Sequence, residues 1–264
     1  IGRCWDGSHI NNCHVTNSSV LGKNEVGGIA GRVYRRTIKT NTPDGQPQNL
    51  MERMAYVTYC TTDNKTVVKG EKLVGGLVGM NYGALVGQCV NNADVFANDI
   101  AGGVAGYSRS YTAKSDGYII ACKSSADATI TSGVYAGGIV GQVFQDTKHS
   151  YTRSWVVGCV SESKIVAAKP ATMIGYSSNA TVTACWAVKN GANVIANDAK
   201  YTYIINEASF QYDAATDATQ ADIDAMNLAI EAFNDSPDNI SIDGTVGAVM
   251  LKRWKLVNGV PVLQ

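Results

Sequence analysis

The hexapeptide Val74-Gly75-Gly76-Leu77-Val78-Gly79 determines the architecture of this chain, because the chain repeats it. The same small-Gly-Gly-apolar-apolar-Gly pattern recurs as Val26–Gly31, Ala101–Gly106 and Ala136–Gly141, and a worn fifth copy is Pro170–Gly175. Such self-similarity is typical of repeat architectures, in which each unit buries its apolar face by stacking on the next. We therefore predict a repeat protein.

A cysteine recurs with each copy of the hexapeptide, about a dozen to fifteen positions before its double glycine. Equivalent side chains of stacked coils form ladders with a spacing of about 4.8 Å. We therefore expect these cysteines to form an internal column of small, buried side chains. The cysteines of this column are Cys13, Cys60, Cys89, Cys122, Cys159 and Cys185.

Two other uses of these cysteines can be weighed from the sequence. The chain has seven cysteines, an odd number, which argues against a fully paired disulfide framework, although a bridge between neighbouring rungs stays open. A metal site is not expected, because no C-x-x-C pair or Cys/His cluster has the spacing of a zinc site. The sequence thus predicts neither metal nor cofactor.

The double glycines are expected to be structural. Glycine at a coil corner adopts positive φ and lets the backbone bend or approach its neighbour closely. A phosphate-binding loop is excluded, because that loop is a single turn leading into a helix and not a repeated one. The predicted structural glycines are Gly27, Gly28, Gly75, Gly76, Gly102, Gly103, Gly137 and Gly138.

The segments between the glycines are short and rich in Val, Ile and Thr, which favours strands over helices. We predict that each repeat holds one strand with the cysteine and a second that ends in the double glycine. The segment from the last glycine to the next cysteine varies most in length, so the insertions should leave one edge of the stack. The predicted fold class is all-β, a right-handed parallel β-helix, with residues 1–197 forming the solenoid.

The last part of the chain, residues 198–264, loses the repeat and is expected to form a small α/β cap on the end of the solenoid. Ile223, Met226, Ile230 and Phe233 have helical spacing, and Thr219 precedes them as the start of a capping box. An Asn-Gly pair near the C-terminus predicts a hairpin between terminal strands.

The pattern Val74–Gly79, followed by Asn81-Tyr82-Gly83 and then Cys89, resembles the GLUG repeat of bacterial surface and secreted proteins, a motif common in Bacteroidales. The resemblance covers about residues 10–190. It implies a parallel β-helix, an extracellular or cell-surface location, and a role in adhesion or scaffolding. It carries no catalytic residues.

Charge and hydropathy exclude some partners. Lys and Arg together number 22, as do Asp and Glu, so the net charge gives no reason to expect nucleic acid. No apolar run approaches the roughly 18–20 residues that span a bilayer, so no transmembrane segment is expected.

Candidate binding residues follow the hexapeptides and fill the longest insertion, Arg32–Ala55. Aromatic side chains one or three positions past the last glycine are expected to form a strip along one edge, suited to stacking on sugars or flat protein surfaces. Basic side chains in the insertion suit an acidic partner. Packing of the rings and a solvated loop are the structural alternatives. The candidates are Tyr34, Tyr82, Tyr107, Phe144, Tyr176, Arg32, Arg35 and Arg36.

These features predict a non-enzymatic, secreted or cell-surface bacterial protein that binds a glycan or a host or bacterial surface protein. One alternative is a passive stalk module within a larger surface protein. Another is a polysaccharide-active enzyme, since many β-helices cleave polysaccharides. That alternative lacks support in the sequence, because Asp94, Asp99, Asp116 and Asp127 are scattered and show no paired-carboxylate spacing.

Overall fold

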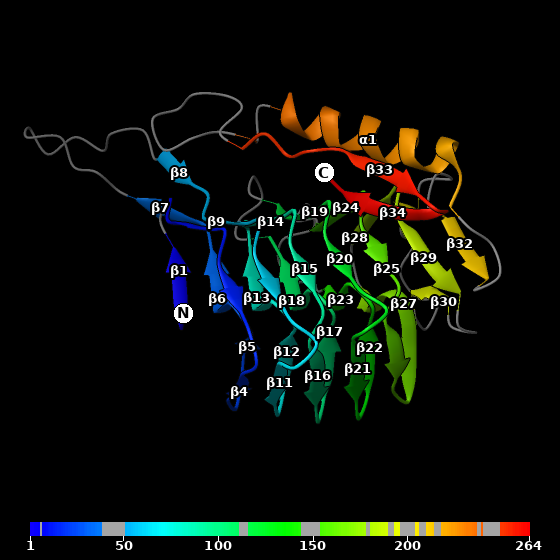
Figure 1. Cartoon of the computed structure of the whole chain (residues 1–264). Helices are drawn as coiled ribbons and strands as arrows, with labels where there is room; N and C mark the ends of the chain where they lie inside the picture. The colour runs from blue at the N-terminus through cyan, green and yellow to red at the C-terminus, as the bar shows by residue number, and fades with distance from the viewer. Residues whose placement is uncertain are drawn as a thin grey trace, which may run out of the picture.

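The computed structural model describes residues 1–5, 7–38, 51–110, 116–143, 154–177, 180–189, 193–195, 204–205, 210–213, 218–236, 239 and 249–264. Within these residues the chain winds as a parallel β-helix, and a complete coil runs through four stacked sheets, called B, C, D and A in the order the chain meets them (Figure 1). The predicted parallel β-helix is confirmed.

Sheets B, C and D each receive one short strand from a coil. The strands of sheet B, in stacking order, are β2 (His9–Asn11), β9 (Tyr56–Thr58), β14 (Leu85–Gly87), β19 (Gly117–Ile120), β24 (Ser154–Val157), β28 (Ala180–Thr183) and β31 (Ile204–Ile205). Those of sheet C are β3 (His14–Val15), β10 (Thr61–Thr62), β15 (Val90–Asn91), β20 (Lys123–Ser124), β25 (Val160–Ser161), β29 (Trp186–Lys189) and β32 (Phe210–Asp213). Those of sheet D are β4 (Ser19–Leu21), β11 (Val67–Gly70), β16 (Asp94–Ala97), β21 (Thr129–Ser132) and β26 (Lys164–Val166).

Sheet A receives two strands from most coils, one on each side of the hexapeptide centre. The strands that end in the glycines are β5 (Val26–Gly27), β12 (Leu73–Gly75), β17 (Ile100–Gly102) and β22 (Tyr135–Gly137). The strands that follow are β6 (Ala30–Tyr34), β13 (Val78–Tyr82), β18 (Ala105–Arg109) and β23 (Val140–Val143), with β1 (Arg3–Trp5) beside β6. The worn copy has no double glycine, and there one strand, β27 (Lys169–Ser177), runs through both positions and also pairs with β30 (Asn193–Ile195).

Close approach of backbones explains the hexapeptide glycines. A Cβ at Gly75 would lie 2.1 Å from Val78 O and 2.5 Å from Gly106 N, and one at Gly103 would lie 2.1 Å from Gly138 O. Real Cβ atoms do not approach backbone that closely, so only glycine fits. The predicted close approach is confirmed. The predicted positive φ is wrong, because no hexapeptide glycine is among the residues with positive φ.

Positive φ occurs instead at the corner between sheets B and C, at the residue before each cysteine of the column. The residues are Asn12, Tyr59, Gln88, Ala121, Gly158 and Ala184, with φ of 49 to 56°. Only one of them is glycine, and Asn12 is the one other residue type that adopts this region readily, so at Tyr59, Gln88, Ala121 and Ala184 stacking imposes the left-handed corner against the local preference of the side chain. The cysteines follow this corner and lie between strands, not within one as predicted.

The cysteine column forms as predicted, with one exposed end. Cys60, Cys89, Cys122, Cys159 and Cys185 lie in the core cluster that also holds Val57, Leu77 and Ile139. Each of these thiols donates to the carbonyl oxygen two residues earlier, as Cys89 Sγ does to Gly87 O at 3.2 Å. Cys13 is exposed because its coil is the first of the stack, and all seven cysteines are free thiols.

Thiol reactivity tests this arrangement. In the native state only Cys13 should react with a disulfide reagent such as Ellman's, because burial hides the other thiols and raises the pKa of Cys89 and Cys159, which keeps those two protonated. After unfolding in denaturant, all seven should react. Two or more fast thiols in the native state, or fewer than seven after unfolding, would contradict a buried column of free thiols.

The solenoid extends beyond residue 197, the predicted boundary. Strand β31 pairs with β28 in sheet B and β32 pairs with β29 in sheet C, so residues as far as Asp213 continue the stack. The predicted segment 198–264 is therefore part repeat and part non-repeat. The sequence predicted a strand at Tyr201–Ile205 but assigned it to the cap and not to the stack, because this coil has no hexapeptide.

The non-repeating part contains helix α1 (Gln220–Asn234) and an antiparallel hairpin of β33 (Trp254–Val257) and β34 (Val260–Leu263). The predicted capping box is present, with Thr219 and Asp222 bonding reciprocally, and the predicted Asn-Gly turn joins the two strands. Asn227 and Asn234 of α1 each exchange two hydrogen bonds with the backbone, at Trp254 and Leu251 respectively. These four bonds tie the helix to Leu251, just before the hairpin, and to Trp254, the first residue of β33.

The described residues of this C-terminal segment cover the side of the solenoid, whereas the sequence predicted a cap on its end. Ile223, Met226, Ile230 and Trp254 form one apolar cluster with outward-facing side chains of sheet B such as Leu85. Figure 1 shows α1 and the hairpin lying along the stack, above sheets B and C. The reason is that sheet B is apolar on both faces, and its outer face must also be buried.

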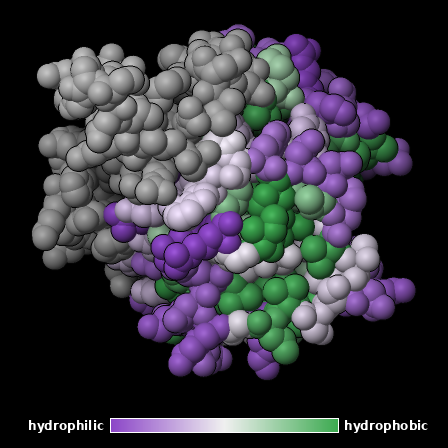
Figure 2. Space-filling model, turned by 90° about the vertical axis from the view of Figure 1, so that its left-hand side faces the viewer, coloured by the Kyte–Doolittle hydropathy of each residue, from purple (hydrophilic) through white to green (hydrophobic). Residues whose placement is uncertain are grey.

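The first coil is not covered by any described element. Figure 2 views the stack from this end and shows apolar surface among polar residues. The large apolar side chains exposed in the first coil are Ile1, Trp5 and Leu21. Residues 1–10 supply strands to sheets A and B, so they form a short first turn.

The variable segments leave one edge of the stack, as predicted. Each falls between a sheet A strand and the following sheet B strand, and these flanking strands are stacked neighbours. In the longest insertion β7 (Arg36–Ile38) pairs antiparallel with β8 (Met51–Arg53), so its two ends form a hairpin base. Residues 39–50 lie outside the described residues.

Candidate binding face on sheet A

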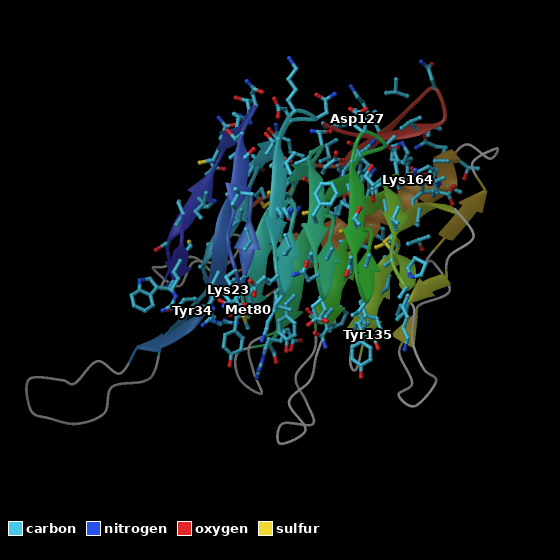
Figure 3. The ribbon with its side chains drawn as sticks, turned by 90° about the horizontal axis from the view of Figure 1, so that it is seen from below. Lys23, Tyr34, Met80, Asp127, Tyr135 and Lys164 are labelled. Carbon is cyan, nitrogen blue, oxygen red and sulfur yellow. The ribbon has the colours of Figure 1, made fainter. Side chains whose placement is uncertain are left out.

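The outer face of sheet A is the candidate site, because it combines exposure with ordered rows of aromatic and basic side chains. The C-terminal segment occupies the outer faces of sheets B and C, where Tyr59 Oη donates to Met250 O and Lys123 Nζ to Pro261 O. Figure 3 shows Tyr34, Met80 and Tyr135 on one side of the solenoid, away from Asp127 and Lys164 on the other. The outer face of sheet A is therefore separate from the faces that the C-terminal segment covers.

One row on this face consists of residues that are in register across four adjacent strands. Trp5 pairs with Tyr34, Tyr34 with Tyr82, and Tyr82 with Arg109. In-register parallel strands place such side chains about 4.8 Å apart along the stack. Trp5 is 45% exposed, and the other three are half-buried, so the row presents ring surface to solvent.

Contacts within this row hold the rings in place. Trp5 and Tyr34 make an edge-to-face contact with ring centroids 5.4 Å apart. The Arg109 guanidinium lies over the Tyr82 ring, 4.6 Å from its centroid, a cation–π geometry. The row is thus preorganised, which lowers the entropic cost of binding.

A second row runs beside the first. Arg32, Met80, Tyr107, Gln142 and Tyr176 are in register on consecutive strands. Met80 and Tyr107 are only 8% and 9% exposed, so the middle of this row is packed, while its ends are more open. Arg32 forms a salt bridge with Glu25 and hydrogen bonds through Nε and Nη2, which fixes the charge at the N-terminal end of the row.

Further along the stack, a third group adjoins Tyr176. The Tyr135 ring lies 5.1 Å from the Tyr176 ring, and Lys169 Nζ lies 5.2 Å from the centroid of Tyr135. The arrangement of ring and cation therefore occurs twice along the face, with Arg109 over Tyr82 near its middle and Lys169 over Tyr135 further along the stack.

The structure places five of the predicted site residues in two rows on the outer face of sheet A and the described others elsewhere. Tyr34 and Tyr82 share one row, while Tyr107, Tyr176 and Arg32 share the second, so the single predicted strip is in fact two. Arg35 is buried at 6% exposure and does not present its charge to solvent. Arg36 lies in β7 of the hairpin. Phe144 lies outside the described residues.

Sequence reasoning missed Trp5, Arg109, Tyr135 and Lys169. Arg109 had a clear signal, because it stands three positions past Gly106, as Tyr34 and Tyr82 do past their own last glycines. Tyr135 and Lys169 precede their glycine positions on the other strand of sheet A, which a search after the hexapeptide does not reach. Trp5 belongs to a coil without a preceding hexapeptide.

Two of the acidic side chains considered in the sequence, Asp94 and Asp116, have structural partners on different sheets. Asp94 accepts from Thr129 N on sheet D, and Asp116 accepts from the Trp155 indole beside sheet B. Across the described ranges, no group of three or more His, Cys, Asp or Glu side chains is placed to hold a metal ion. No helix in the described part of the chain is long and apolar enough to cross a bilayer.

The fold and this face define a class: a parallel β-helix repeat protein with an aromatic and basic outer face on one sheet. Compared with protein-family models, with curated proteins and with solved structures, the chain has no significant match in any of the three.

Proposed function

We propose that the protein is a non-catalytic binding protein of the GLUG-repeat type, secreted or displayed at a bacterial cell surface, and that it holds an extended glycan against the outer face of sheet A. The observation that carries the proposal is the partly exposed row Trp5, Tyr34 and Tyr82, which ends in Arg109. A protein surface is the alternative partner.

A glycan suits this row for geometric and chemical reasons. Aromatic rings give sugar rings a large, flat apolar surface at low cost in side-chain entropy. The spacing of about 4.8 Å between rungs is close to the length of one sugar ring in an extended chain. A glycan lying along the stack would therefore meet one ring per sugar.

The charges of the face favour an acidic glycan over a neutral one. Arg3, Arg109 and Lys169 lie on the same face as the rings, and Arg32 on that face is paired with Glu25. Guanidinium and ammonium groups form charge-assisted hydrogen bonds with carboxylates and sulfates. Binding should accordingly weaken as ionic strength rises, because salt screens exposed charges.

A glycan-array screen of the wild-type protein and the double variant Tyr34→Ala/Tyr82→Ala tests the proposal. We expect the wild type to bind a subset rich in acidic sugars and the double variant to lose at least tenfold in affinity, since each stacked ring contributes about 1 kcal/mol. Phe96→Ala is the matched control, because Phe96 is a half-buried aromatic on the outer face of sheet D.

The outcomes separate the binding role from a purely structural one. Unchanged glycan binding by the double variant would show that the binding site does not include these rings. Absence of glycan binding by the wild type would leave the stalk module, in which the same rings serve only to pack against each other.

A further inference from the structure

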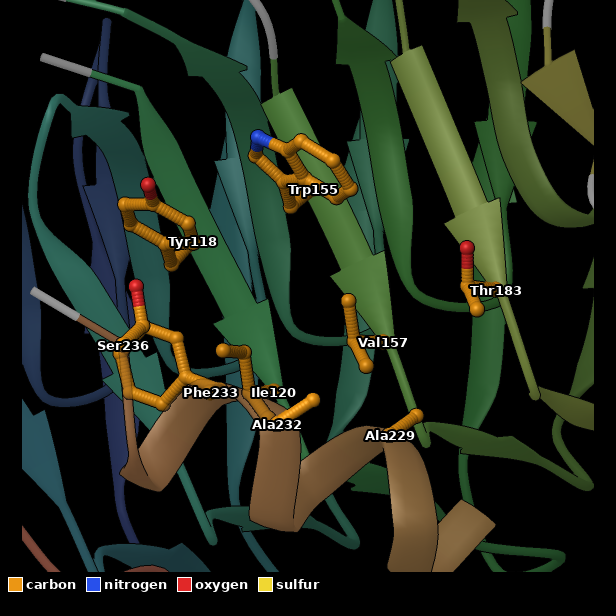
Figure 4. A pocket seen from close by; sticks show the side chains of 9 residues that line it. All are labelled: Tyr118, Ile120, Trp155, Val157, Thr183, Ala229, Ala232, Phe233 and Ser236. Atoms are coloured by element: carbon orange, nitrogen blue, oxygen red, sulfur yellow. The ribbon is translucent and has the colours of Figure 1, made fainter. Parts of the chain in front are cut away.

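A pocket of about 300 Å³ lies on the outer face of sheet B beneath α1, away from the sheet A face (Figure 4). Its floor comes from three neighbouring strands, β19, β24 and β28, and its wall from the C-terminal half of α1. This volume is at the lower end of the range for small-molecule sites. The lining residues are Tyr118, Ile120, Trp155, Val157, Thr183, Ala229, Ala232, Phe233 and Ser236.

The pocket exists because of two alanines on the helix. Elsewhere α1 fills the space against sheet B with Ile223, Met226 and Ile230, which are fully buried. At this place it presents Ala229 and Ala232, three positions apart and so on one side of the helix. Their short side chains leave open the space that a larger residue would fill.

The walls are aromatic and held in position. The Trp155 indole N–H donates to Asp116 Oδ2 at 2.7 Å, which fixes the plane of the ring. Tyr118 and Phe233 contact each other with ring centroids 5.2 Å apart. Figure 4 shows these rings around the opening, with Trp155 and Tyr118 on the strands and Phe233 on the helix. Such walls suit a flat ring compound.

One polar group in the lining points to a ligand independently of the walls. The Thr183 hydroxyl oxygen is buried and has no hydrogen-bond partner among the described residues. A buried hydroxyl without a partner is unfavourable in a folded protein, and a ligand or water that bonds to it relieves the cost. Thr183 lines the pocket at the end of β28.

We propose that this pocket binds a small, flat, apolar ring compound that carries one hydroxyl group, and that the hydroxyl bonds to Thr183. The site is distinct in place and chemistry from the glycan face, since it lies on another sheet and its lining is largely apolar. It does not depend on the proposed glycan binding.

Two probes that differ by one hydroxyl test the assignment. We expect saturable binding of both 2-naphthol and naphthalene to the wild-type chain, measured by ligand-observed saturation-transfer NMR. The variant Thr183→Val, which keeps the side-chain shape, should weaken 2-naphthol binding about fivefold and leave naphthalene binding unchanged, as expected for one lost hydrogen bond.

Variants that fill the pocket test the location. Ala229→Leu should weaken binding of both probes at least tenfold, and Ala232→Leu serves the same purpose if the first variant fails to fold. Leu228→Ala is the control, because Leu228 is 69% exposed on the same helix and does not line the pocket. Wild-type chain that binds neither probe, or filled variants that bind both as the wild type does, would overturn the proposal. Equal loss of both probes in Thr183→Val would overturn the role of the hydroxyl.

Discussion

Replacement of Gly103 by alanine should lower the free energy of unfolding by about 3–4 kcal/mol, at the upper end of the cost of overpacking. The new Cβ would lie 2.1 Å from Gly138 O and 2.3 Å from Ser124 Oγ. The serine hydroxyl can rotate, but Ser124 Cβ, 2.7 Å away, and Gly138 O cannot move without a shift of the backbone of sheet C or of the next coil. The strain would therefore spread into both coils.

Urea unfolding followed by circular dichroism measures this cost. Gly2→Ala is the matched control, because a Cβ at Gly2 meets nothing within 4 Å, and its effect should stay within about 0.5 kcal/mol. Gly87→Ala should fall between the two, since the nearest atom there belongs to the Leu251 side chain and can rotate away. If Gly103→Ala proves no more destabilising than Gly2→Ala, close backbone packing is not the reason for the hexapeptide.

Trp254→Ala should destabilise the protein by about 3–5 kcal/mol, the usual cost of removing a large buried aromatic side chain. Trp254 is 1% exposed and packs in the cluster between sheet B and α1. Its indole N–H donates to Gly158 O at 2.7 Å, so it also joins the C-terminal segment to the corner before Cys159. The substitution would leave both a cavity and an unpaired carbonyl.

Two further variants separate these contributions. Trp254→Phe keeps most of the ring but removes the donor, so it should cost about 1–2 kcal/mol. Met250→Ala, at a side chain that is 63% exposed, should change stability by less than about 0.5 kcal/mol. A loss below about 1 kcal/mol for Trp254→Ala would contradict the packing of the C-terminal segment on the side of the solenoid.

The stacked coils could be predicted from the sequence because the repeated hexapeptides mark each successive coil. The hexapeptides and the cysteines of successive coils are in register, as the pairs Gly75 with Gly102 and Gly102 with Gly137 show. Local signals also predicted α1 and its capping box, since Thr219 and Asp222 interact within one helical turn. These features depend on residues that are close in the sequence or that occupy equivalent positions in successive repeats.

The position of the C-terminal segment could not be predicted in the same way. The apolar stripe of α1 shows that one helix face is covered, but it does not identify the covering surface. A signal was present in sheet B, where Tyr118, Ile119 and Ile120 are consecutive and all buried, as expected for a strand with both faces covered. The left-handed corners were hidden because Tyr59, Gln88 and Ala121 carry no local preference for positive φ.

The candidate site was predicted in part. The positions past the hexapeptide led to Tyr34 and Tyr82, because a fixed offset from the repeat places side chains in one row. The offset could not show that Tyr107 is packed, since its burial depends on side chains from neighbouring strands. Nor could it find Lys169 over Tyr135, which combines strands β27 and β22.

The measurement that tests the binding face most directly is the affinity of the wild-type protein for oligosaccharides of increasing length, drawn from the glycan that binds best. If the glycan lies along Trp5, Tyr34 and Tyr82, affinity should rise with each added sugar until the row is covered and then level off. The double variant Tyr34→Ala/Tyr82→Ala should lose this dependence on length. Affinity that does not change with length, or that rises equally in the double variant, would contradict a glycan held along the outer face of sheet A.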